Sequence, residues 1–67
     1  MISRVTLLRA TEETDGSWTC SSGQIAFDRH GDLAGALTQL EAMADTMCAA
    51  KLIIERLDGS VENCRSA

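Results

Sequence analysis

The chain has 67 residues and a mass of 7.2 kDa, enough for one small domain, which we expect to span residues 1–67. Hydrophobic residues make up 45% and charged residues 24% of the chain, a balance typical of a folded protein and unlike that of a disordered one. Six basic and ten acidic residues give a net charge of −4, which disfavours direct binding of nucleic acid or of an anionic membrane surface.

The N-terminal part of the sequence predicts three short strands. Ser3–Ala10 is the first, with Val5 and Leu7 on one face and Leu8 on the other. The polar segment Thr11–Gly16 predicts a turn. Two further strands are expected at Ser17–Cys20, with Trp18 and Cys20 on one face, and at Gln24–Asp28, with Ile25 and Phe27 on one face; Ser21–Gly23 separates them.

A change of period marks a helix. We expect Arg29–Asp32 to be a loop whose last residue, Asp32, is the N-cap, because its carboxylate can accept from free amides of the first helical turn. Apolar residues then recur at steps of three and four, which is typical of one face of a helix. They are Leu33, Leu37, Leu40, Ala44 and Met47. Lys51 marks the predicted end of the helix.

A final hairpin closes the chain. The segment from Leu52 to Leu57 predicts a buried strand, and the segment from Ser60 to Arg65 predicts its partner. Asp58-Gly59 between them indicates a type I′ turn. One helix must bury its apolar face against one face of the sheet. The predicted fold class is therefore α+β, an antiparallel sheet of four to five strands packed on one helix.

The second face of this sheet has no predicted cover. Leu8 and one side of Leu52–Ile54 would then be exposed to water. We therefore predict that a homodimer contact or another protein covers this face. No apolar run approaches the roughly 18 residues of a membrane span, and Met1–Arg4 does not begin a signal peptide, so we expect no membrane association.

The three cysteines are odd in number and widely spaced, which predicts buried thiols and a cytoplasmic location. His30 is the only histidine, and with a cysteine or with carboxylates it has the groups for a small enzymatic site. A zinc site would draw on Cys20, His30, Cys48 and Cys64, but their spacing lacks the close pairs of zinc motifs. We therefore expect no cofactor and no metal.

Two features suggest a protein partner. Trp18, the only tryptophan, fits either an interface anchor or a filler of a small core. Four carboxylates from Asp28 to Asp45 are candidates for one acidic edge, which would complement a basic nucleic-acid-binding surface on another protein. These are Asp28, Asp32, Glu41 and Asp45. The alternatives are an ordinary solvated surface or, for the last two, a cation or acid–base site.

Three segments form a pattern: Asp15–Trp18, the alanine-rich helix and Lys51–Val61. They resemble a family of small bacterial domains of unknown function, which has a Gly-x-Trp strand, one helix and a closing Leu-Ile-Ile-x-x-x-Asp-Gly-x-Ile hairpin. Compared with that family, Gln24–Asp28 is an addition. The resemblance implies two strands, a helix and two strands, and assigns no catalytic residues. In size and acidity the chain is also similar to phage-encoded anti-CRISPR inhibitors, and in layout partly to the antitoxin of HicAB-type modules.

The sequence thus predicts a non-enzymatic, cytoplasmic protein-binding module. The most specific form of this prediction is a mobile-element-encoded inhibitor that occludes a nucleic-acid-handling complex. The alternatives are an orphan dimeric bacterial domain with a housekeeping role, a HicB-like antitoxin-type partner, or a small metal-binding or enzymatic domain that uses His30.

Overall fold

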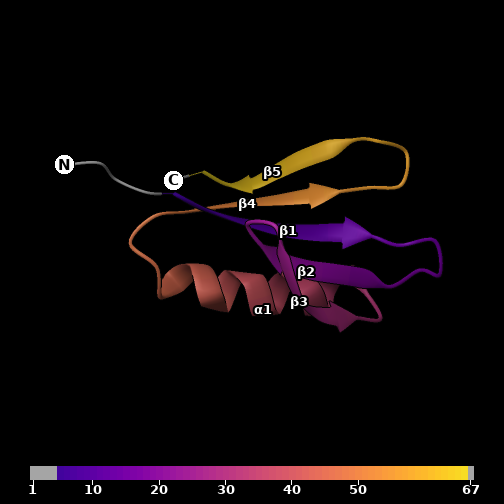
Figure 1. Ribbon diagram of the computed structural model, residues 1–67, viewed down its shortest axis with the longest axis horizontal. Coiled ribbons are helices and arrows are strands. Elements are labelled where there is room, and N and C mark those ends of the chain that lie inside the picture. The colour runs from indigo at the N-terminus through magenta and orange to yellow at the C-terminus, as the bar shows by residue number, and fades with distance from the viewer. Residues whose placement is uncertain (1–4, 67) are drawn as a thin grey trace.

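Five strands and one helix form the structure, a computed structural model that describes residues 5–66. The elements in chain order are β1 (Thr6–Glu12), β2 (Trp18–Ser22), β3 (Ile25–His30), α1 (Leu33–Asp45), β4 (Ala50–Glu55) and β5 (Val61–Arg65). The strands make one sheet, and α1 lies along one of its faces (Figure 1). The predicted class, an α+β fold with one helix on a sheet, is confirmed.

The sheet is mixed, in the order β3-β2-β1-β4-β5. Three strand pairs are antiparallel, but β1 and β4 are parallel, so the prediction of a wholly antiparallel sheet is wrong at this pair. The reason is the helix, whose 13 residues extend about 20 Å and return the chain to the end of the sheet where β1 begins. The strand after such a crossover runs in the same direction as β1.

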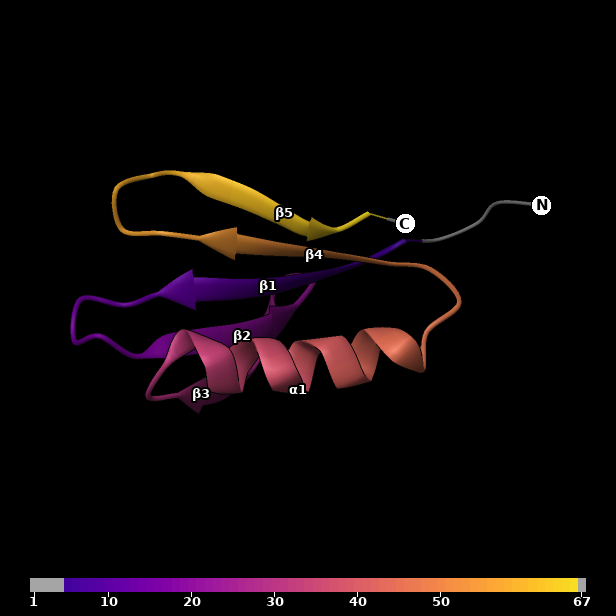
Figure 2. The same cartoon turned by 180° about the vertical axis from the view of Figure 1, so that it is seen from behind.

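The core lies between α1 and the sheet (Figure 2). Leu8 and Leu52, which are opposite each other on β1 and β4, are both fully buried, as is Leu40 on the helix. Leu8 therefore faces α1, and the prediction that it faces water on the other side is wrong. The other buried members of the core are Ala10, Trp18, Cys20, Ala36, Ala44, Ala50 and Ile54.

The helix begins where the sequence predicts. Asp32 Oδ1 accepts a hydrogen bond from the Gly35 amide at 2.7 Å, which confirms its role as the N-cap. The helix ends at Asp45, six residues before the predicted end at Lys51. Ala50 and Lys51 instead pair with Thr6 and Leu7 of β1, because these pairs continue the parallel ladder.

Strands β2 and β3 are also longer than predicted, because their pairing with the neighbouring strands continues past the predicted ends. β2 continues through Ser22, which pairs with both Leu8 and Ile25, although a break was expected at Ser21. β3 continues through Arg29 and His30, although a loop was expected there. A bulge follows Cys20, so that Phe27 is the extra residue of β3 between two regular pairs.

Both Asp-Gly loops have the same backbone. The Gly16 amide donates to the Glu13 carbonyl and the Gly59 amide to the Arg56 carbonyl, at 3.1 and 3.0 Å. Each glycine has a φ of +88°, but no other residue type in the described chain has a positive φ. A type I′ turn requires two positive φ values, so the prediction for Asp58-Gly59 is wrong. The loops are three-residue turns that end in a left-handed glycine.

Candidate functional site

Trp18 lies in the core with an exposed fraction of 8%. It starts β2, pairs with His30 of β3 and contributes its ring to the space under α1. Of the two interpretations of this residue, burial favours the core filler. A partner protein does not reach a side chain in this position without rearranging the fold.

The four carboxylates of the predicted acidic edge fall into two groups, Asp28 with the helix N-cap Asp32 just after β3, and Glu41 with Asp45 beside β5. Asp28 is on β3, where its Oδ2 is 3.8 Å from His30 Nε2. Asp45 and Glu41 instead face β5, and their carboxylates lie 2.8 and 3.9 Å from Arg65 Nη1. Because β3 and β5 are the two outer strands, these residues form two separate acidic flanks and no single edge.

A polar cluster joins β3 to the first turns of α1. His30 Nε2 contacts Gln39 Oε1, and the Arg29 amide donates to Asp28 Oδ1 at 2.8 Å. That amide is the main cause of the lowered pKa of Asp28. A Cβ at Gly35 would lie 3.1 Å from His30 Nδ1, so this glycine permits the close approach of helix and strand. These contacts hold β3 against the start of α1, and this structural role accounts for the cluster.

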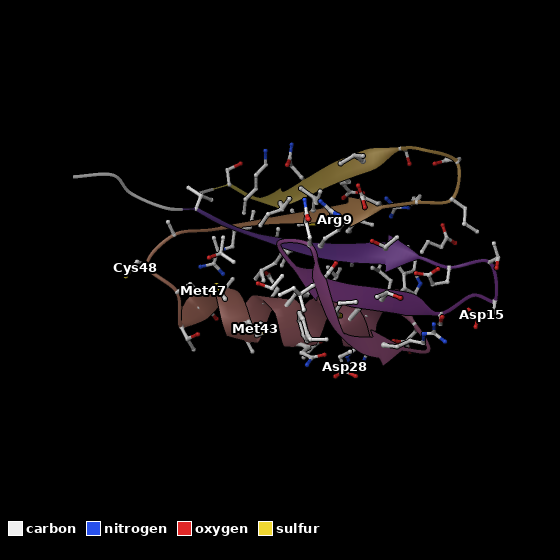
Figure 3. The ribbon with its side chains drawn as sticks, viewed as in Figure 1. Arg9, Asp15, Asp28, Met43, Met47 and Cys48 are labelled. Carbon is white, nitrogen blue, oxygen red and sulfur yellow. The ribbon has the colours of Figure 1, made fainter. Side chains whose placement is uncertain are left out.

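The cysteines do not assemble with His30. Cys20 is buried, its Sγ lies 3.9 Å from the Ala36 carbonyl oxygen, and burial raises its thiol pKa, so it is held in the unreactive protonated form. Cys48 and Cys64 are exposed, so the prediction of buried thiols is correct for Cys20 alone. Cys64 is on β5, at the opposite edge from His30, and Cys48 follows the far end of α1 (Figure 3).

The face of the sheet opposite α1 is open, and the strand register defines what lies on it. One row across the sheet runs from Arg29 through Thr19, Thr11 and Glu55 to Val61. The next row runs from Ala26 through Ser21, Arg9 and Ile53 to Asn63, with Phe27 beside it. Leu7 and Lys51 form the start of a third row.

The open face has a polar half and an apolar half. In the polar half, Arg9 Nε lies 3.3 Å from Glu55 Oε1, and Thr11 Oγ1 donates to the same oxygen at 3.3 Å. The apolar half, toward the start of β1, contains a set that we call the open-face patch. It consists of Leu7 and Ile53, which the strand register places on this face, and of Val5 and Phe27, which the alternation of side chains along the backbone assigns to it. Val5 is 52% and Phe27 39% exposed, while Ile53 is 8% exposed although it lies outside the core cluster.

Sequence reasoning missed Phe27 as a surface residue and missed a short repeat. The alternation of Val5 and Leu7 identified one face of the first strand, but the bulge that turns Phe27 to the same face has no sequence signal. The repeat is Glu-x-x-Asp-Gly-Ser, at residues 12–17 and 55–60. It was readable in the sequence, and it produces the two matching loops.

Comparison with known proteins adds no family: no family model, curated protein or solved structure matches this chain. Within residues 5–66 there is no pocket and no group of three or more His, Cys, Asp or Glu side chains arranged to hold a metal. No helix in this part of the chain is long and apolar enough to cross a membrane. The open-face patch is the candidate site that remains.

Proposed function

We propose that this chain is a non-catalytic protein-binding module that acts by covering a surface of a larger protein through its open-face patch. The observation that carries the proposal is the position of Phe27. It is a large aromatic side chain, 39% exposed, on the face of the sheet that α1 leaves open. Exposed aromatic residues beside other apolar groups are typical of binding surfaces, where a few such anchors supply most of the affinity.

The surroundings of Phe27 support this interpretation. Leu7 on β1 and Ile53 on β4 lie two and three strands from Phe27 on the same face, where they supply partly and fully shielded apolar surface, and Val5 extends it with a 52% exposed side chain. Polar side chains border this surface, as around many interfaces. The sheet beneath is held by four ladders, so the patch is rigid and costs little entropy to order on binding.

The experiment compares two variants that add the same charge on opposite sides of the molecule. Phe27→Asp removes the aromatic anchor, and Ala42→Asp places the same carboxylate on the exposed outer side of α1. Immobilised protein is used to capture a partner from the cytosol of the source cell. Loss of a hot-spot residue costs at least about 2 kcal/mol, or roughly 30-fold in affinity. We expect the Phe27 variant to lose a protein that wild type and the Ala42 variant both retain.

Circular dichroism must show that both variants keep the wild-type fold. A capture pattern that is the same for the Phe27 variant and wild type would contradict the proposal.

A second candidate function is inhibition of a nucleic-acid-handling protein by the helix side of the molecule. The observation that favours it is an excess of carboxylates there, which includes both acidic flanks. Among residues 5–66, the cations that lie with these carboxylates are Arg56 and Arg65. A basic groove on the target would be complementary to this surface. Reversing the charges of Glu41 and Asp45 to lysine would abolish this mode of binding and leave binding through Phe27 intact.

A further inference from the structure

We propose that the open-face patch binds an acidic segment of its partner protein, and that Lys51 forms an ion pair with a carboxylate of this segment. This inference rests on the proposed function and adds the chemistry of the partner to it. It comes from the placement of cations beside the apolar residues of the open face.

The open face is less acidic than the rest of the molecule. The strand register places Arg9, Arg29 and Lys51 on the open face. Three carboxylates accompany them: Glu13 and Glu55 each accept a hydrogen bond from a threonine of the same face, and Asp15 lies 3.9 Å from Arg29 Nη1. The chain as a whole has a net charge of −4. Among residues 5–66, the open face therefore has as many cations as carboxylates, but the two charged side chains in the rows that contain Leu7 and Ile53 are both cations, Lys51 and Arg9.

Lys51 is the cation least neutralised within the fold. It is directly opposite Leu7 of the open-face patch, and its side chain is exposed. Among residues 5–66, no carboxylate lies within ion-pair distance of its amino group. A carboxylate on a docked segment would complete this pair while apolar side chains of the same segment cover Leu7 and Phe27.

Arg9 reinforces the preference for a carboxylate. It is opposite Ile53, in the row next to Lys51. Its Nε is shielded from solvent and lies 3.3 Å from Glu55 Oε1, but it makes no well-aligned hydrogen bond. The ion pair with Glu55 is thus incomplete, and the guanidinium keeps part of its capacity to attract a second carboxylate.

Two other occupants fit this surface less well. A second copy placed face to face would bring Lys51 and Arg9 of both copies into one interface, and it would bury Thr11, Thr19 and Ser21 in place of apolar side chains. A nucleic acid would find one exposed aromatic ring, Phe27, and two cations beside it, Lys51 and Arg9, which are few contacts for a phosphate backbone. An acidic and partly apolar protein segment suits both the cations and the patch.

The test uses two synthetic probes that differ only in charge, a peptide of four Gly-Leu-Glu repeats and one of four Gly-Leu-Lys repeats. Binding is followed by amide shifts in nuclear magnetic resonance spectra of the labelled protein. We expect the Glu peptide to shift the amides of Leu7, Phe27 and Lys51 in a saturable way, and the Lys peptide to leave them in place. Lys51→Glu should weaken binding of the Glu peptide at least about fivefold, since an exposed charge contact has this order of effect.

Arg56→Glu is the matched control, because it changes the net charge by the same amount on the helix side of the hairpin. It should leave the affinity for the Glu peptide within about twofold of wild type, because solvent ions screen the interaction between distant exposed charges. Equal effects of the two variants would overturn the role of Lys51.

The remaining outcomes each decide the inference. Binding of the Lys peptide at the same amides, or of neither peptide, overturns it. So does a shift of those amides by a ten-residue oligothymidylate, or a sedimenting dimer that Lys51→Glu dissociates. The proposed function is judged separately: if Phe27→Asp loses the captured partner and Lys51→Glu does not, protein binding stands and the acidic partner is wrong.

Discussion

At the residue scale, Gly31 and Gly59 both have free space around them but differ in one backbone angle, φ. Gly59 has a φ of +88° and closes the β4–β5 loop, whereas Gly31 precedes the helix without a positive φ. A Cβ at either position would meet no atom within 4 Å, so sterics with neighbouring residues do not distinguish them. The cost of a side chain therefore depends on the backbone conformation alone.

We expect Gly59→Ala to lower the free energy of unfolding by about 1 kcal/mol or more, because an alanine in the left-handed region is strained. Gly31→Ala is the control, and it should be neutral or stabilising by a few tenths of a kcal/mol, since it reduces the entropy of the unfolded chain. Urea unfolding of the two variants measures both values. Equal destabilisation by the two substitutions would show that the turn assignment at Gly59 is wrong.

At the scale of elements, the two Asp-Gly-Ser loops are near copies that lie at the same end of the sheet (Figure 1). In each loop the aspartate Oδ1 accepts from the backbone amide of the serine, at 2.9 Å for Asp15 and 2.8 Å for Asp58. The parallel pairing of β1 and β4 brings them together, and the Leu57 amide donates to Glu12 Oε1 at 3.0 Å between them. Each loop is therefore an internal control for the other.

The serine hydroxyls provide a test of this symmetry. Hydrogen bonds from Ser17, of which the hydroxyl is the stronger at 2.6 Å, lower the pKa of Asp15, and bonds from Ser60 lower the pKa of Asp58. Ser17→Ala should raise the pKa of Asp15 and leave the pKa of Asp58 in place, which a carboxyl-carbon titration measures. Because both pKa values are lowered in the fold, stability from these loops is present above the unfolded value near 3.8 and is lost as pH falls through the folded values.

An identical change at both aspartates would show that the effect of Ser17→Ala is global. A melting temperature that stays constant from pH 5 down to pH 2 would contradict the predicted loss of stability in acid.

The elements also show what the sequence could predict. The helix stripe from Leu33 to Met47 was readable because the apolar period of a helix is local, and Met47 packs on the core even though the helix ends before it. The direction of β4 and the side on which Leu8 lies depend on where α1 returns the chain, which no local pattern encodes. The split of the four carboxylates follows from the same crossover, because it separates β3 from β5 by three strands.

At the scale of the whole molecule, all described elements depend on one layer of side chains between α1 and the sheet. Leu40 is at the centre of the helix side of that layer, with an exposed fraction of 0%. Chains below about 70 residues rarely obtain more than 3–5 kcal/mol of stability from a single core. The loss of one central side chain therefore removes most of the free energy of unfolding of the whole domain.

Leu40→Ala should cost about 2–5 kcal/mol, because it removes apolar contact and leaves a cavity under α1. We expect the variant to be largely unfolded at 25 °C. Far-ultraviolet circular dichroism reports the helix, and the emission of Trp18, the only tryptophan, reports the sheet side of the same core. Both signals should be lost together in a cooperative transition.

Leu57→Ala is the control, because Leu57 is 57% exposed in the β4–β5 loop. This variant should keep both signals, and its free energy of unfolding should lie within about 0.5 kcal/mol of the wild-type value. A variant at Leu40 that loses helical signal while Trp18 stays shielded would show that the sheet folds without α1, and the single-core description would then be wrong.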